Sequence, residues 1–106
     1  WRHGMSVIVE LSIFPVDKAG ASLSPYVARV LRVLQASGLP FELNPMGTCI
    51  EGDWEPVWAA VSACMRELQK DSERVYLTVK ADWRRGQDRR MAAKVDAVRE
   101  KLGGGA

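Results

Sequence analysis

The chain has 106 residues, 47% of them apolar, with 15 basic and 13 acidic side chains and a formal net charge of +2. Area scaling predicts that a single domain of this length buries roughly 65% of its unfolded surface, enough for a core but not for a deep internal active site. The near-neutral charge argues against a nucleic-acid partner. No apolar run approaches the roughly 18 residues of a membrane-spanning helix, so we expect no membrane partner.

The two ends of the sequence differ in character from the domain between them. Residues 1–4 precede Met5 and look like the remnant of an expression tag, and they hold His3, the only histidine. Without that residue, histidine catalysis and His-rich metal sites are not expected. We expect a single domain over residues 5–102 and a flexible glycine-rich tail over residues 103–106.

The two cysteines indicate whether the protein resides in a reducing or an oxidising compartment. Cys49 and Cys64 form no CxxC motif and have no histidine partner. We interpret them as buried thiols in a reducing compartment, with a disulfide or redox pair as the alternative. No signal-like apolar segment follows Met5, which also favours a cytoplasmic protein.

The first predicted strand runs from Ser6 to Phe14, because residues of one parity are uniformly aliphatic and residues of the other are mixed. Pro15 ends the strand. A helix is then predicted from Ser24–Pro25 to Gly38, with Ser24 as its N-cap and Ser22 as a competing cap. Its apolar stripe has helical spacing and contains Val27, Val30, Leu31 and Leu34.

The middle of the chain predicts a hairpin. Phe41–Asn44 alternates with apolar residues at odd positions, Pro45–Gly47 forms the turn, and Thr48–Glu51 is the returning strand. The length of the turn is not fixed by the pattern. Either of the two sets of alternate residues in the returning strand can therefore face the core.

A second helix opens at Gly52–Asp53, with Asp53 able to cap it. Its buried stripe contains Val57, Val61, Cys64, Met65 and Leu68. A strand follows at Arg74–Asp82, and then a basic loop over Trp83–Arg90. A short C-terminal helix is defined by Met91, Val95, Val98 and Leu102.

The order β-α-β-β-α-β-α predicts an α+β fold of the ferredoxin-like kind, also called the alpha-beta plait. Two right-handed crossovers give an antiparallel sheet of order 4-1-3-2 with two helices on one face. The other face, here called the bare face, mixes rings, hydroxyls, amides and charges. Its members are Ile8, Glu10, Ser12, Phe14, Glu42, Asn44, Tyr76, Thr78 and Lys80.

The composition of the bare face is too apolar for full hydration and too polar for a dry core. We expect another subunit to cover it, with its sheet or its third helix; a solvated sheet face is the alternative. The last strand lies at the edge of the predicted sheet, so it can also extend the sheet across subunits.

Three segments together resemble the small prokaryotic thiamine-binding protein family. They are ELSIFP at Glu10–Pro15, NPMGT at Asn44–Thr48 leading into IEG at Ile50–Gly52, and RVYLTVK at Arg74–Lys80 with residues 82–85 behind it. The resemblance implies a homodimer or homotetramer that binds thiamine or its hydroxymethylpyrimidine moiety, without catalysis and without a cofactor. The sequence departs from the pattern at Trp83, where an acidic residue is expected, and at Cys49, where an aliphatic one is expected.

Thiamine joins a flat aminopyrimidine to a cationic thiazolium, and the candidate ligand-binding residues follow from that chemistry. We expect Phe14, Met46 and Tyr76 to form the apolar walls of the site. Ser12, Asn44 and Thr48 are expected to supply hydrogen bonds. Glu10 or Glu51 is expected to supply a carboxylate. The same residues can instead shape the hairpin, pack an interface or, for Glu51, act on a helix dipole. We predict no catalytic and no metal-ligating residue. The alternative function is a structural or regulatory oligomer without a small-molecule ligand.

Overall fold

The computed structural model describes residues 6–18, 20, 22–85 and 90–103. The strands are β1 (Ser6–Pro15), β2 (Phe41–Asn44), β3 (Gly47–Asp53) and β4 (Val75–Arg84). The helices are α1 (Ser24–Ser37), α2 (Trp54–Gln69) and α3 (Arg90–Lys101). The predicted element order is confirmed. The expected tag remnant at 1–4 and residues 104–106 of the expected tail lie outside the described residues, as do residues 86–89 of the predicted basic loop.

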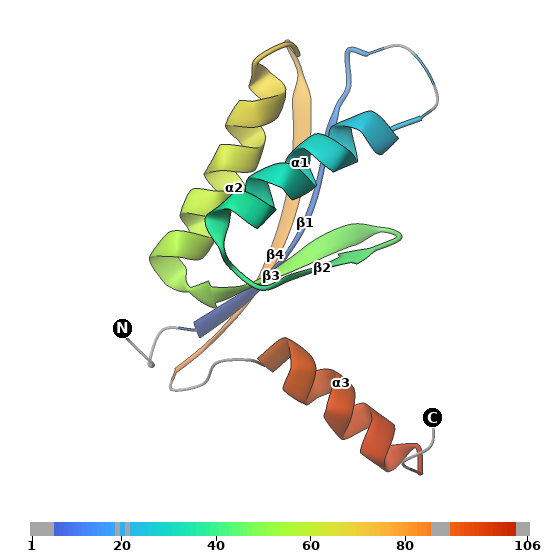
Figure 1. Cartoon of the computed structure of the whole chain (residues 1–106), viewed down its shortest axis with the longest axis vertical. Helices are drawn as coiled ribbons and strands as arrows, with labels where there is room; N and C mark the ends of the chain where they lie inside the picture. The colour runs from blue at the N-terminus through green and yellow to red at the C-terminus, as the bar shows by residue number, and fades with distance from the viewer. Residues whose placement is uncertain (1–5, 19, 21, 86–89, 104–106) are drawn as a thin grey trace.

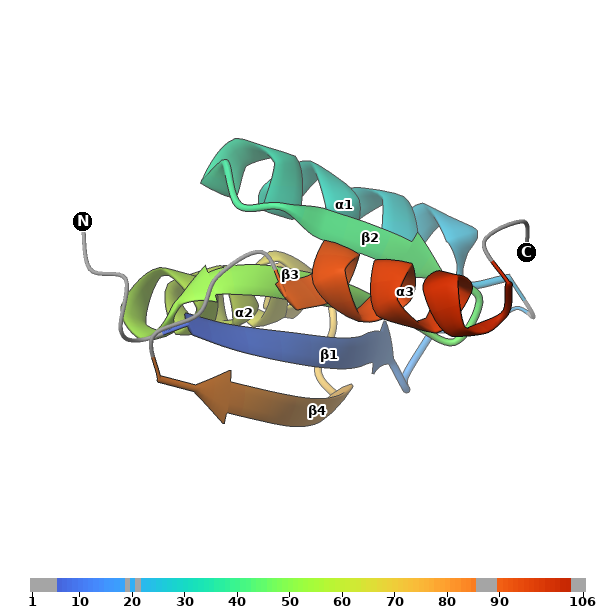
Figure 2. The same cartoon turned by 90° about the horizontal axis from the view of Figure 1, so that it is seen from below.

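The four strands form one antiparallel sheet of order β2-β3-β1-β4, which confirms the predicted ferredoxin-like topology (Figure 1). β1 lies inside the sheet and pairs with β3 on one side and β4 on the other. Its pairing with β4 runs from Ser6↔Arg84 to Pro15↔Val75, so β4 is two residues longer than the predicted Arg74–Asp82 strand at its C-terminal end. The helices α1 and α2 pack on one face, and α3 lies on the other side of the sheet (Figure 2).

The ends of the helices follow local chemistry in part, and neither predicted side-chain cap forms. Asp53 occupies the N-cap position of α2, as predicted, but its side chain makes no capping hydrogen bond. Ser24 is the first residue of α1, and Leu23 occupies the N-cap position without a side-chain hydrogen bond. The predicted Ser24 cap is therefore wrong, and the competing Ser22 hydroxyl accepts a hydrogen bond from the Ser24 amide. Pro25 fits here because a proline ring is tolerated in the first turn, where its missing N–H costs nothing. Gly38 ends α1 with φ at 76°, a left-handed conformation that glycine adopts without strain.

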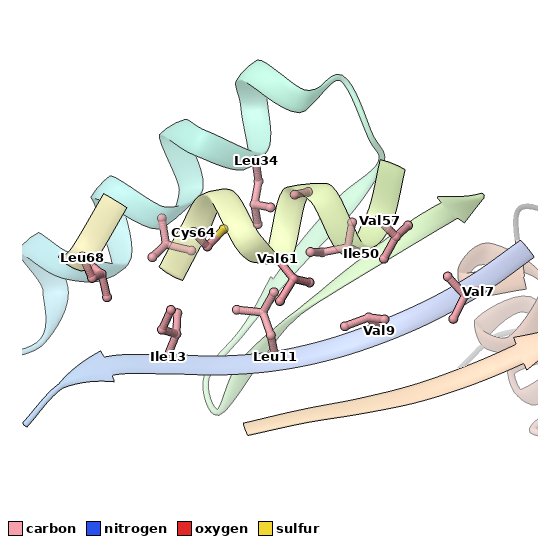
Figure 3. Packing of buried hydrophobic residues seen from close by; sticks show 12 residues of the cluster. Val7, Val9, Leu11, Ile13, Leu34, Ile50, Val57, Val61, Cys64 and Leu68 are labelled. Carbon is pink, nitrogen blue, oxygen red and sulfur yellow. The ribbon is translucent and has the colours of Figure 1, made fainter. Parts of the chain in front are cut away.

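The core lies between the sheet and the pair α1 and α2, and Figure 3 shows how its side chains converge. The aliphatic side of β1 supplies Val7, Val9, Leu11 and Ile13, as the alternation predicts. The helices supply one stripe each, and their fully buried members are Leu34, Val57, Cys64 and Leu68. Met65 and Leu31, also expected in the stripes, are only partly buried at the margin of this core.

A polar cluster ties the outer ends of the helices together. The Arg29 guanidinium donates to Glu67 Oε2 at 3.0 Å and to the Glu67 carbonyl at 2.7 Å, and it contacts Asp71 Oδ1 at 3.0 Å. Nearby, the Asp17 carboxylate accepts hydrogen bonds from the Ser72 hydroxyl and from the Glu73 amide at 2.7 Å. These contacts join the loop after β1 to the connection between α2 and β4.

We predict that Leu34→Ala destabilises the domain by about 2–5 kcal/mol, because it removes a fully buried side chain and leaves a cavity between α1 and the sheet. Leu43→Ala is the matched control, since Leu43 is exposed on β2. Urea unfolding should show a large loss of unfolding free energy for Leu34→Ala and a small loss for Leu43→Ala. Equal losses would contradict the described core.

A second prediction concerns acid stability. The hydrogen bonds from Ser72 and from the Glu73 amide lower the pKa of Asp17 to about 2. A carboxyl whose folded-state pKa lies below its unfolded value of about 3.9 stabilises the fold above that value and loses the contribution as pH falls toward 2. Asp17→Asn should therefore flatten the dependence of the urea midpoint on pH between 4 and 2. An unchanged slope would show that Asp17 is not bonded as described.

Candidate functional site

The strand register decides which residues share the bare face. Glu42 pairs with Cys49, Cys49 with Glu10, and Glu10 with Lys80, so these four side chains form one row across all four strands. Ile8 pairs with Glu51 on one side and Asp82 on the other, which forms a second row. The open question about the returning strand is thereby resolved. Cys49 and Glu51 belong to the bare face, and their neighbours in sequence belong to the core face.

Phe14 and Tyr76 form an aromatic pair at one end of the bare face. They are register partners, and their rings stack with centroids 5.7 Å apart and planes at 21°. Tyr76 remains 55% exposed. Ser12 lies one row further in, opposite Thr78. The structure thus brings together three predicted site residues: Ser12, Phe14 and Tyr76.

Glu10 lies near the centre of the bare face, and its side chain lies beside Gly47 at the start of β3. Its carboxylate is 3.4 Å from Lys80 Nζ. A Cβ on Gly47 would lie 3.1 Å from the Leu11 carbonyl oxygen and 3.4 Å from Glu10 Cγ. A side chain at Gly47, the first residue of β3, would therefore press on the β1 backbone, which would have to move by a few tenths of an ångström. This gives the glycine of the NPMGT segment a packing role that the sequence analysis did not assign.

The remaining candidate ligand-binding residues, which lie in the hairpin, occupy different environments. Asn44 Nδ2 lies 3.6 Å from Cys49 Sγ, which places the amide beside the central row of the bare face. Met46 is exposed at the turn. Thr48 pairs with Leu11 and is buried on the face covered by α1 and α2. The structure therefore does not bring the predicted hydrogen-bonding residue Thr48 together with the others, because the register turns it toward the core.

Glu51 lies in a different environment from the other candidates. It is only 3% exposed, and its Oε1 accepts a hydrogen bond from the Met91 amide of α3 at 3.4 Å. The adjacent pocket has a volume of about 220 Å³ and is lined by Pro40, Phe41, Glu42, Glu51, Met91 and Ala92. A second contact, from Lys94 Nζ to Asp82 Oδ2 at 2.6 Å, holds the same turn of α3 against the sheet. A buried carboxylate thus faces a small cavity with apolar walls.

Phe41 and Met91 are pocket residues that the sequence analysis missed. Phe41 was expected only as an apolar strand residue, and Met91 only as part of the stripe of the C-terminal helix. They meet because the Glu51 amide donates to the Pro40 carbonyl at 3.1 Å and the Glu51 carboxylate accepts from α3. No spacing along the chain reveals either contact. Such a cavity suits a flat heterocycle whose N–H groups donate to the carboxylate.

The cysteines are both free. Cys64 is buried in the core as predicted, whereas Cys49 is only half-buried on the bare face. Burial raises the pKa of the Cys64 thiol to about 11. Burial also raises the pKa of the Cys49 thiol, and the nearby Glu10 and Glu42 carboxylates raise it further. Neither environment favours the thiolate needed for nucleophilic chemistry.

Among the residues that the structure describes, no group of three or more His, Cys, Asp or Glu side chains is arranged to hold a metal ion. Within the same ranges, no helix has the length and apolar character required to cross a membrane.

The chain is similar to a protein-family model, to related sequences and to solved structures. A family model described as "Thiamine-binding protein" matches residues 9–99. A UPF0045 protein of Methanothermobacter thermautotrophicus is 38% identical over 98 residues, covering 91% of this chain and 99% of that protein. The crystal structure of MJ1052 from Methanocaldococcus jannaschii superposes with a TM-score of 0.79 at 33% identity, covering 88% of this chain and 95% of the other. A Thermotoga maritima structure, whose name refers to thiamine biosynthesis or salvage, has a TM-score of 0.65 at 25% identity and covers 73% of this chain and 82% of its own.

The thiol environments generate a prediction. In the folded protein at pH 8, a disulfide reagent such as DTNB should modify Cys49 slowly and leave Cys64 unmodified until the protein is unfolded, because only the thiolate reacts. Cys49→Ser should abolish the reaction of the folded protein. Rapid modification of two thiols per folded chain would contradict the described burial.

Proposed function

The chain belongs to the thiamine-binding protein family, and we propose that it is a non-catalytic, cytoplasmic binding protein for thiamine or its hydroxymethylpyrimidine moiety that acts as a homo-oligomer. The observation that carries the ligand proposal is the buried Glu51 carboxylate at the wall of the 220 Å³ pocket. The name of the Thermotoga maritima relative supports the same ligand class.

The aminopyrimidine half of thiamine matches the chemistry of this pocket. Its amino group is a hydrogen-bond donor, and a carboxylate is a strong acceptor for that group. Phe41 and Met91 provide an aromatic and a thioether wall, which favour a flat ring. The pocket is smaller than the roughly 300–1,000 Å³ typical of sites for drug-sized ligands, so it suits one ring rather than all of thiamine.

The cationic thiazolium half would then extend over the bare face. The central row there presents the Glu10 and Glu42 carboxylates, and the stacked Phe14 and Tyr76 rings offer electron-rich faces further along. Lys80 lies close to Glu10 and offsets part of its charge. We therefore assign most of the proposed binding energy to the ring in the pocket and less to the cation.

The proposed function is tested by titration calorimetry with thiamine and, separately, with hydroxymethylpyrimidine. We expect heat from each, and we expect 2-methylpyrimidine to give none, since it is a flat ring of the same kind without any N–H group to donate to Glu51. Chromatography of the recovered ligand should show it unchanged, as expected for binding without catalysis. No heat and no thermal shift at millimolar ligand would overturn the proposal.

We predict that Glu51→Gln weakens ligand binding by about 10- to 100-fold, because hydrogen bonds to a charged group contribute about 1.5–3 kcal/mol. The glutamine keeps an oxygen that can accept from the Met91 amide, so the helix contact is retained. Glu100→Gln, on an exposed side of α3, is the matched control and should bind as the unmodified chain does. Equal affinities for all three proteins would show that the carboxylate does not contact the ligand.

The alternative function, a structural or regulatory oligomer without a small-molecule ligand, is supported by the stack of half-buried Phe14 with exposed Tyr76. In that case the bare face serves protein contact alone. Self-association without any heat from either ligand would favour this alternative.

A further inference from the structure

The helix α3 is held on the sheet by two carboxylates that lie in one row. On β3, Glu51 accepts a hydrogen bond from the Met91 amide at 3.4 Å. On β4, Asp82 pairs with Lys94 Nζ at 2.6 Å. Both carboxylates are register partners of Ile8 on β1. Because Met91 and Lys94 are three residues apart, they lie on the same side of the helix, and the first turn of α3 therefore lies across β1.

Beyond this turn, α3 has little support from the rest of the domain. Within the described part of the chain, it packs extensively against no other element, and Figure 1 shows it standing apart from α1 and α2. The side chains of Lys94 and Asp82 are 56% and 53% exposed, and such exposed ion pairs contribute little to stability. A 12-residue helix is also only marginally stable by itself. The position of α3 is therefore set by weak contacts that a ligand can strengthen.

The pocket beside Glu51 is built from two parts that are attached separately. Four of its six lining residues belong to the β2 and β3 side, and the other two, Met91 and Ala92, belong to α3. A ligand in the pocket gains its contacts with Met91 and Ala92 only when α3 is docked. Because it binds the docked form better, it shifts α3 toward that form.

The ligand and α3 do not compete for Glu51. A carboxylate has two oxygens, each with two lone pairs, so it can accept from a ligand amino group and from the Met91 amide at the same time. A ring held by Glu51 therefore bridges the sheet and the helix, and does not displace the helix.

We propose that α3 is a movable wall of the ligand site, which the bound ligand docks onto the sheet, and that Lys94 is a positioning residue for this wall. Lys94 does not line the pocket, and it acts through the pair with Asp82 that holds Met91 and Ala92 in place. The coupling is reciprocal, so a stronger attachment of α3 raises ligand affinity by the factor with which ligand strengthens the attachment. This inference rests on the proposed function and deepens it, because it assigns the regulation of the same pocket.

The first test is titration calorimetry with hydroxymethylpyrimidine at pH 8, where this ring carries no charge. Lys94→Ala should weaken binding by about 2- to 5-fold, the range expected for the loss of an exposed ion pair. Lys94→Arg should restore binding, because a guanidinium can also pair with Asp82. Lys101→Ala removes the same charge from the exposed end of α3 and is the matched control, which should bind as the unmodified chain does. The urea midpoints of Lys94→Ala and Lys101→Ala should agree, since neither residue contributes to the core.

Salt dependence separates positioning from a general effect on folding. Raising the salt concentration from about 0.05 M to about 0.5 M screens an exposed ion pair, so it should weaken binding of the uncharged ring to the unmodified chain. Binding to Lys94→Ala should change little with salt, because this variant lacks the pair. A role of Lys94 in folding alone would not remove the salt dependence.

Hydrogen exchange measured by mass spectrometry reports on α3 directly. In the ligand-free protein we expect the amides of residues 95–101 to exchange within seconds, because α3 opens locally. With hydroxymethylpyrimidine at about ten times its dissociation constant, this exchange should slow about tenfold, since the ligand depletes the open form that lacks one wall of the pocket. The last turn of α2 does not line the pocket and should exchange at the same rate with and without ligand.

Either of two results would overturn the inference. One is a Lys94→Ala variant that binds as tightly as Lys101→Ala. The other is bound ligand that leaves exchange in α3 unchanged. Both results keep the heat of binding to the unmodified chain, and the proposed function with it. If the unmodified chain gives no heat, the proposed function fails first and this inference fails with it.

Discussion

The pairing of β1 with a neighbour on each side is the constraint on which the rest of the structure depends. Because β1 is bonded to β3 and to β4, its alternation is imposed on the whole sheet. The aliphatic side must face α1 and α2, and the mixed side must face away. The proposed ligand site lies on that second side, which α1 and α2 leave open.

Much of the fold could be predicted from the sequence because the strands have a clear period of two and the helices a clear period near 3.6. The residues Val7, Val9, Leu11 and Ile13 are buried as the period requires. The site was less predictable, because its members depend on a register that a turn decides. One residue of register separates a Thr48 on the bare face from the buried Thr48 that is found. The Glu51 pocket also needs a contact with Met91, forty positions away, which periodicity does not contain.

Glu51 links the proposed ligand site to the attachment of α3. One carboxylate satisfies the amide at the start of α3 and also faces the cavity beside it. The position of the helix and the occupancy of the pocket therefore involve the same group. This arrangement explains why a small open domain can offer a buried polar anchor without a deep internal cavity.

The Arg29 cluster has a consequence for how the two sides of the molecule respond to their surroundings. Arg29, Glu67 and Asp71 join the helices on the side of the sheet opposite the bare face, in partly exposed positions. Attractions between exposed charges weaken as dissolved ions accumulate around them, over a screening length of about 10 Å at 0.1 M salt. Raising ionic strength thus loosens the attachment between α1 and α2, while the hydrophobic contacts of the sheet and its covering helices are strengthened or unchanged. The ion pairs between the helices and the hydrophobic core beneath them therefore respond to salt in opposite directions.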